Sequence, residues 1–128
     1  MRRLHVSRIF CVALVCLLAA CSRAGAMPVV HMGDTNFTQD SITIQKGQTI
    51  QLVDESAQFH TISNGSWVDG DQNAKIDAGA PVANELQING NTQAALGPFN
   101  KVGTFHYFCS VHSGMNLTVV VTHSAMLL

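Results

Sequence analysis

One stretch near the end of the sequence constrains the fold most, because it joins two strand-like segments through a short loop rich in metal-binding side chains. Residues alternate between two faces along 104–109 and again along 117–122, which is the period of a β-strand. The loop between them carries Cys109, His112 and Met115, each three residues from the next. A thiolate, an imidazole and a thioether are therefore offered at one end of a pair of strands.

The donor types of this loop favour copper. Cys and Met supply soft sulfur, and sulfur combined with imidazole selects copper over zinc and over the hard cations. A mononuclear copper site needs one more strong donor, and His60, on a different strand-like segment much earlier in the chain, is the natural candidate. The alternative interpretation is that His60 is an ordinary histidine with no ligand role.

Strand-type alternation continues through most of the chain from Val29 onward, and no segment has a convincing helical period. Residues 42–45 and 50–53 alternate on either side of Lys46-Gly47, which predicts a short hairpin. A second pair of alternating segments flanks Asn89-Gly90, a strong turn signal, and predicts another hairpin.

Residues 63–84 show little alternation. They are interpreted as a long irregular excursion with one short helical turn near 73–76. Since strands dominate the rest of the chain, the fold class predicted is all-β, most simply a sandwich of short strands.

The first 20 residues are interpreted as a signal peptide and not as part of the fold. A basic start containing Arg2, Arg3 and Arg8 precedes an apolar run that is too short to span a bilayer comfortably and that ends in small residues. An extracytoplasmic location follows from this interpretation.

The end of this segment, Leu18-Ala19-Ala20-Cys21, resembles the lipoprotein box of bacteria. The resemblance implies that Cys21 is lipidated and that acyl chains anchor the domain to the bacterial cell membrane. Secretion or release into the periplasm, with cleavage near Ala24 or Ala26, is the alternative. The boundaries predicted on this basis are 1–20 for the signal peptide, 21–28 for the lipidated Cys and tether, 29–123 for the domain and 124–128 for a C-terminal tail.

Charge and cysteine content exclude nucleic-acid binding and favour a metal-ligand role for Cys109. Without the signal segment the chain keeps four basic and eight acidic residues, a formal charge of −4, so it lacks the basic surface that nucleic-acid binding requires. Cys11 and Cys16 leave with that segment and Cys21 is lipidated, which makes Cys109 the one remaining free thiol. An exported free thiol is open to oxidation unless it is buried or bound to metal, so a ligand role is favoured.

Taken together, these motifs resemble the cupredoxins, the type 1 blue-copper family, and most of all their amicyanin and plastocyanin branches. The resemblance covers residues 30–122. The motifs that carry it are the Lys46-Gly47 turn, His60-Thr61-Ile62, the run from Gly103 to Cys109, and Cys109-x-x-His112-x-x-Met115. It implies a Greek-key β-sandwich of the cupredoxin type, with His60, Cys109 and His112 as strong ligands of one copper ion. Met115 would then be the long axial ligand.

Thr61 departs from the family pattern. Many members have Asn after the first ligand histidine, and its side chain braces the ligand loop. Thr61 offers only a hydroxyl, so a weaker brace toward the Ser110 region is expected.

The resemblance implies a monomeric electron carrier, and not an enzyme, whose copper alternates between Cu(I) and Cu(II) while it meets redox partners transiently. A copper chaperone or storage protein of the cell envelope is the main alternative, although it would not need a thiolate buried behind Phe105 and Tyr107. A Cys-His hydrolase would leave Met115 without a role. A dinuclear copper centre needs a second nearby Cys, which the chain lacks.

Overall fold

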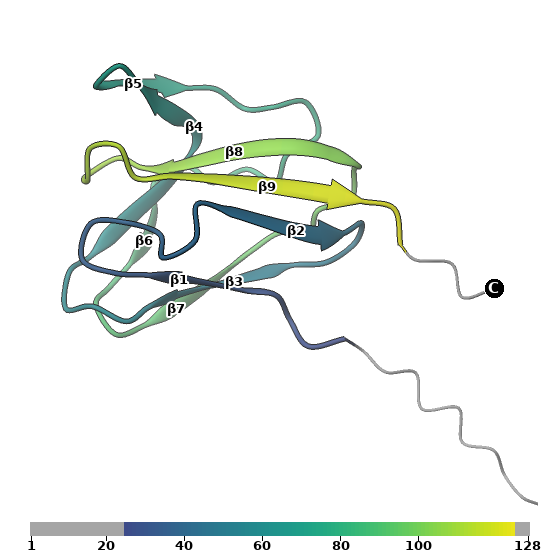
Figure 1. The fold of residues 1–128 in the computed structure, drawn as a ribbon, viewed down its shortest axis with the longest axis horizontal. Coiled ribbons are helices and arrows are strands. Elements are labelled where there is room, and N and C mark those ends of the chain that lie inside the picture. Colours follow the sequence, from purple (N-terminus) through teal and green to yellow (C-terminus); the bar gives the residue numbers. More distant parts are fainter. Residues whose placement is uncertain (1–24, 125–128) are drawn as a thin grey trace, which may run out of the picture.

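Residues 25–124, the part of the chain that the computed structural model describes, form a sandwich of two β-sheets (Figure 1). The strands are β1 (Val29–Met32), β2 (Ser41–Gln45), β3 (Ile50–Asp54), β4 (His60–Val68), β5 (Asp71–Ala74), β6 (Leu86–Ile88), β7 (Gln93–Leu96), β8 (Gly103–Cys109) and β9 (Asn116–Thr122). No helix in this range is long and apolar enough to cross a bilayer. The predicted signal peptide, Cys21 and most of the C-terminal tail lie outside the described residues.

The two sheets differ in size. One has the order β1-β3-β7, and the other has the order β2-β9-β8-β4, with β5 and β6 also paired to β4. β1 pairs with β3, and β2 with β9, in parallel, whereas the other pairs are antiparallel. The all-β sandwich predicted from the period of the sequence is therefore confirmed.

Apolar side chains from the inner faces of both sheets fill the space between them. The smaller sheet contributes Val30, Met32, Ile50, Leu52 and Leu96, and the larger sheet contributes Ile44, Ile62, Phe105, Tyr107, Leu117, Val119 and Val121. Each fully buried side chain of this kind stabilises the fold by roughly 1.5–3 kcal/mol. This core fixes β4 and β8 side by side, and these two strands carry the first two candidate ligands.

The hairpin predicted around Lys46-Gly47 is wrong, although both strands exist. β2 belongs to the larger sheet and β3 to the smaller one, and the turn at Gly47, with φ of 91°, carries the chain from one layer to the other. The same holds for β6 and β7 on either side of Asn89-Gly90. In both cases the two strands contribute buried residues to the same core from different sheets, and period-two alternation does not distinguish this arrangement from pairing edge to edge.

The interpretation of residues 63–84 also needs correction. β4 continues as far as Val68, turns at Asp69-Gly70 and returns as β5, so the first part of the segment is a hairpin and no helical turn forms at 73–76. The φ angles of Asp69 and Gly70 are 51° and 88°, as a two-residue type I′ turn requires. Alternation is missing because all of β5 is exposed and has no buried face.

Candidate metal centre

His60 and Cys109 meet because they stand at adjacent ends of two paired strands. His60 is the first residue of β4 and Cys109 is the last of β8, and the antiparallel register sets Ile62 opposite Cys109. The backbone N–H of Ser110 donates to the carbonyl of Thr61 at 2.9 Å and extends this ladder by one step. The core of the sandwich therefore brings the upstream histidine to the loop that follows β8.

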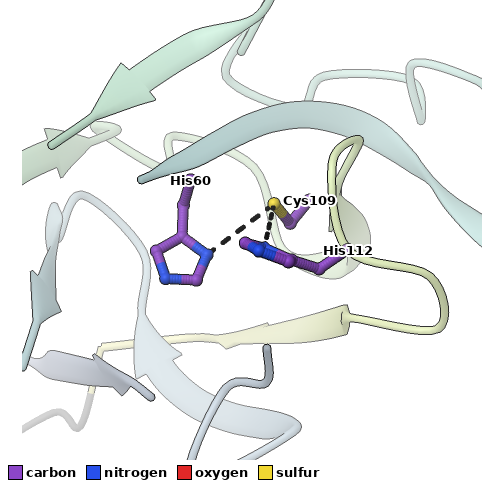
Figure 2. Close-up of side chains that lie close together, drawn as sticks. All are labelled: His60, Cys109 and His112. Carbon is purple, nitrogen blue, oxygen red and sulfur yellow. Dashed lines mark hydrogen bonds between the residues drawn. The ribbon is translucent and has the colours of Figure 1, made fainter. Parts of the chain in front are cut away.

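Three of the four residues singled out in the sequence converge in space (Figure 2). The Sγ atom of Cys109 lies 3.7 Å from Nδ1 of His60 and 3.4 Å from Nδ1 of His112. The two imidazole rings are tilted against each other with centroids 4.8 Å apart. One sulfur and two nitrogen donors thus face a common point.

Met115 closes the loop that begins at Cys109. The backbone N–H of Cys109 donates to the carbonyl of Met115 at 3.0 Å, and the N–H of Met115 donates to the carbonyl of His112 at 3.2 Å. The Met115 side chain is buried. The loop is therefore a tight turn whose ends are tied to each other.

The cluster is buried on one side and open on the other. His60 and Cys109 have no exposed surface, whereas His112 is half-buried. Phe59 and Val111, the residues before His60 and His112, expose 55% and 45% of their surface. Two exposed apolar side chains are therefore next to the histidines in sequence, and His112 is the one residue of the cluster that reaches solvent.

The electrostatic surroundings keep His60 neutral. Burial lowers the pKa of His60 below its ordinary value, and the neighbouring Asp54 carboxylate only partly opposes this effect. An imidazole must be unprotonated to bind a metal, so this direction favours ligation.

Asp54 is a buried neighbour of the cluster that the sequence did not point to. Its Oδ1 accepts hydrogen bonds from the N–H and the hydroxyl of Ser56, both at 2.8 Å, and lies 3.7 Å from Nε2 of His60. In the sequence this Asp looked like an ordinary turn residue after an alternating segment. In the fold its side chain is fully buried at the end of β3, beside the imidazole.

Thr61 braces the ligand loop through its backbone. Its N–H points at Sγ of Cys109 at 3.4 Å, and its carbonyl accepts from the N–H and, at 3.4 Å, from the hydroxyl of Ser110. The hydroxyl that joins the two segments is therefore that of Ser110, and not that of Thr61 as the sequence suggested. Thr61 contributes only its backbone N–H and carbonyl to this brace, and almost any other residue would supply the same two groups.

The substitution Thr61→Val is consequently expected to leave the centre intact. Because the main-chain contacts remain, the visible spectrum of the copper-loaded protein should not change, and the free energy of unfolding should fall by no more than about 1 kcal/mol. Absorption spectroscopy and urea denaturation check this. Loss of the absorption band in Thr61→Val would show that the side chain itself supports the ligand loop.

The donor set fits copper better than other common metals. One cysteine sulfur and two imidazoles, with His60 and Cys109 buried, match the soft and borderline preferences of copper, and hard cations would require oxygen ligands. Cys109 is the one Cys within residues 25–124 and forms no disulfide.

Comparison with known proteins agrees with this reading of the site. Residues 26–122 match the family described as copper-binding proteins of the plastocyanin/azurin family. Amicyanin from Paracoccus versutus has a similar structure, with a TM-score of 0.58 and 21% identity over 76% of this chain and 82% of that protein. A purple cupredoxin from Nitrosopumilus maritimus has a TM-score of 0.57 and 16% identity over 74% of this chain and 99% of that protein.

These likenesses show that the sandwich is the cupredoxin fold, as the sequence motifs implied. A search of curated proteins gave no match. The family match covers most of the sequence and includes all three residues of the buried cluster, and copper is therefore the metal of this protein. The chain belongs to the plastocyanin/azurin family of copper-binding proteins.

Proposed function

We propose that this protein is a type 1 blue-copper electron carrier in which His60, Cys109, His112 and Met115 hold one copper ion. The observation that carries the proposal is the convergence of two Nδ1 atoms on one buried Sγ atom, at 3.7 and 3.4 Å. Copper bound there would alternate between Cu(I) and Cu(II) and so take up and release one electron.

The chain's contribution is a site whose parts are already in place. His60 and Cys109 come from strand ends joined by a hydrogen-bonded ladder, and the loop from Cys109 to Met115 is tied at both ends. Metal-donor atoms that cannot move far suit an electron carrier, because the site then rearranges little when copper gains or loses an electron. The buried side of the site also excludes water from the thiolate.

The proposed route for the electron is the half-exposed ring of His112. Phe59 and Val111, which directly precede His60 and His112, are exposed and apolar and would allow a partner to dock without desolvating charged groups. Contacts of this type are small and short-lived, as an electron carrier needs. The proposal therefore includes transient redox partners, a monomeric carrier and no catalytic role.

The proposal also includes a lipid anchor at Cys21 and an extracytoplasmic location. The described chain enters β1 and leaves β9 at the end of the sandwich opposite the loop that joins β8 to β9 (Figure 1). An anchor preceding β1 would therefore leave the metal centre facing away from the membrane, where soluble or membrane-bound partners reach it.

Optical and EPR spectra of the copper-loaded protein, followed by voltammetry, test the proposal. Thiolate-to-Cu(II) charge transfer should give an intense blue colour, and the protein should show one reversible one-electron wave. A pale copper complex without a reversible wave would contradict the carrier and would favour the chaperone or storage role.

A further inference from the structure

The β4–β5 hairpin lies beyond β8, with its turn at the same end of the molecule as the ligand loop (Figure 1), and two of its side chains hydrogen-bond the beginning of that loop. Nε1 of Trp67 donates to the carbonyl of Cys109 at 2.8 Å, and Nε2 of Gln72 donates to the carbonyl of Ser110 at 2.8 Å. Two consecutive carbonyls, starting with that of the thiolate residue, are thus held by one hairpin.

The same hairpin holds the far end of the loop. The backbone N–H of Trp67 donates to Oδ1 of Asn116 at 2.7 Å, and Nδ2 of Asn116 donates to the carbonyl of Trp67 at 3.1 Å. The Asn116 side chain therefore pairs with the Trp67 backbone as a neighbouring strand would. Since Asn116 directly follows Met115, the hairpin is hydrogen-bonded to both ends of the ligand loop.

Trp67 also covers the outer face of β8 behind Cys109. Phe108 points away from the core by strand alternation, yet it is only 2% exposed. The indole of Trp67 packs edge-on against its ring, with centroids 6.2 Å apart and planes at 86°. The hairpin therefore packs on Phe108, the residue that directly precedes Cys109 in β8.

We infer that the β4–β5 hairpin is a clamp that holds the ligand loop in its copper-binding conformation, with Trp67, Gln72 and Asn116 as positioning residues. This inference rests on the proposed function for the meaning of the loop, but the contacts exist in the protein chain alone. Thr61 supplies one brace for the loop, and the hairpin supplies a second.

A clamp of this kind matters because the loop would otherwise be free to move. Ser113 and Gly114 at its tip are exposed, and exposed loops open most readily. Carbonyls that bond to protein donors instead of water hold the backbone in one conformation before the metal arrives. Less conformational entropy then remains to be lost on binding, and metal release requires the clamp to open.

Three variants of the hairpin test the inference. Trp67→Phe keeps the aromatic packing but removes the indole N–H, and Gln72→Met keeps the length of the side chain but removes its donor. Asn73→Ala is the matched control, because Asn73 is exposed on the same strand and its side chain makes no hydrogen bond to the loop. Release of Cu(I) to a strong chelator should be about tenfold faster for Trp67→Phe and about threefold faster for Gln72→Met, with no change for Asn73→Ala.

A second measurement uses the metal-free protein. Trp67 is the one tryptophan of the chain, so its indole N–H gives a single NMR signal whose slow exchange with solvent reports the closed clamp. In Trp67→Phe and Gln72→Met, amide exchange should accelerate at Ser110 and Met115 but not along β9. Uniform acceleration in every strand would mean that these residues serve only global stability, and would overturn the clamp.

The two proposals fail in different ways. If both hairpin variants behave like Asn73→Ala in copper release and in exchange, the clamp is wrong even in an intensely blue protein. If the wild-type protein lacks type 1 spectra, the electron carrier is wrong, while the exchange comparison in the metal-free chain still decides whether the hairpin holds the loop.

Discussion

Replacing Cys109 by Ser is expected to abolish the intense blue colour of the copper-loaded protein while leaving the sandwich folded. The colour depends on charge transfer from a thiolate, and a hydroxyl cannot supply it. The Ser side chain is smaller and still accepts a hydrogen bond from the N–H of Thr61, which lies 3.4 Å from Sγ in the wild type. Loss of the fold is therefore not expected.

Copper affinity should fall as well, by more than the roughly 10–100-fold that loss of a residue supporting a ligand typically costs. Visible absorption and competition with a chelator measure the two effects. Ser110→Ala is the matched control, because the backbone bond from Ser110 to Thr61 survives and only a hydroxyl contact of 3.4 Å is lost. A Cys109→Ser protein that keeps the intense band would refute the assignment of Cys109 as the thiolate ligand.

The second large effect is expected for Gly65→Ala, where β4 lies opposite Ala74 of β5. A Cβ atom there would overlap the carbonyl oxygen of Asn73 and lie 2.8 Å from the nitrogen of Lys75, so the two strands would have to separate. The φ angle of 125° is also unfavourable for any residue with a Cβ. We expect a loss of about 3 kcal/mol in the free energy of unfolding.

Gly70→Ala in the turn of the same hairpin is the control for this substitution. Gly70 also has a positive φ, of 88°, but nothing lies within 4 Å of the position where a Cβ would be added. Its cost should therefore be the conformational term alone, about 1 kcal/mol. Urea denaturation measures the loss in free energy of unfolding for each variant, and the difference between the two losses is the cost of the close contact at Gly65. Equal losses would contradict the close contact between the strands.

Gly65→Ala should also accelerate copper release, because strands forced apart move Trp67 and Gln72 away from the loop. Gly70→Ala should leave release nearly unchanged. The pair of variants thus connects the geometry of the hairpin to the behaviour of the metal centre through a change that touches neither the ligands nor the clamp side chains.

Most strand positions and the ligand loop were accessible from the sequence because both are local patterns, whereas β5 was missed because it has no buried face and so does not alternate. Alternation over a few residues marks a strand and its buried face whatever lies across from it. Cys109, His112 and Met115 are neighbours along one short loop, so their proximity needs no knowledge of the fold. His60 could be found because the loop lacked one strong donor and a strand-like segment offered a histidine.

Strand partners were not accessible in the same way. β2 and β3 are adjacent in sequence and both alternate, but the structure sets them in different sheets, and the same is true of β6 and β7. Pairing is decided by the burial of apolar faces contributed from distant parts of the chain. A turn signal such as Lys46-Gly47 reports only that the chain reverses, and not whether it remains in the same layer.

The sequence alone thus determined the class of the fold and pointed to the three residues that converge in the structure, His60, Cys109 and His112, because residue type and period-two alternation are local properties. Only the tertiary structure decided what surrounds them: Asp54 behind His60, the backbone brace of Thr61, and the hairpin that holds both ends of the loop. The physical reason is that several of these contacts are made to main-chain groups, which every residue possesses. Such contacts cannot be predicted from residue types, because they form only when the fold brings the two segments together.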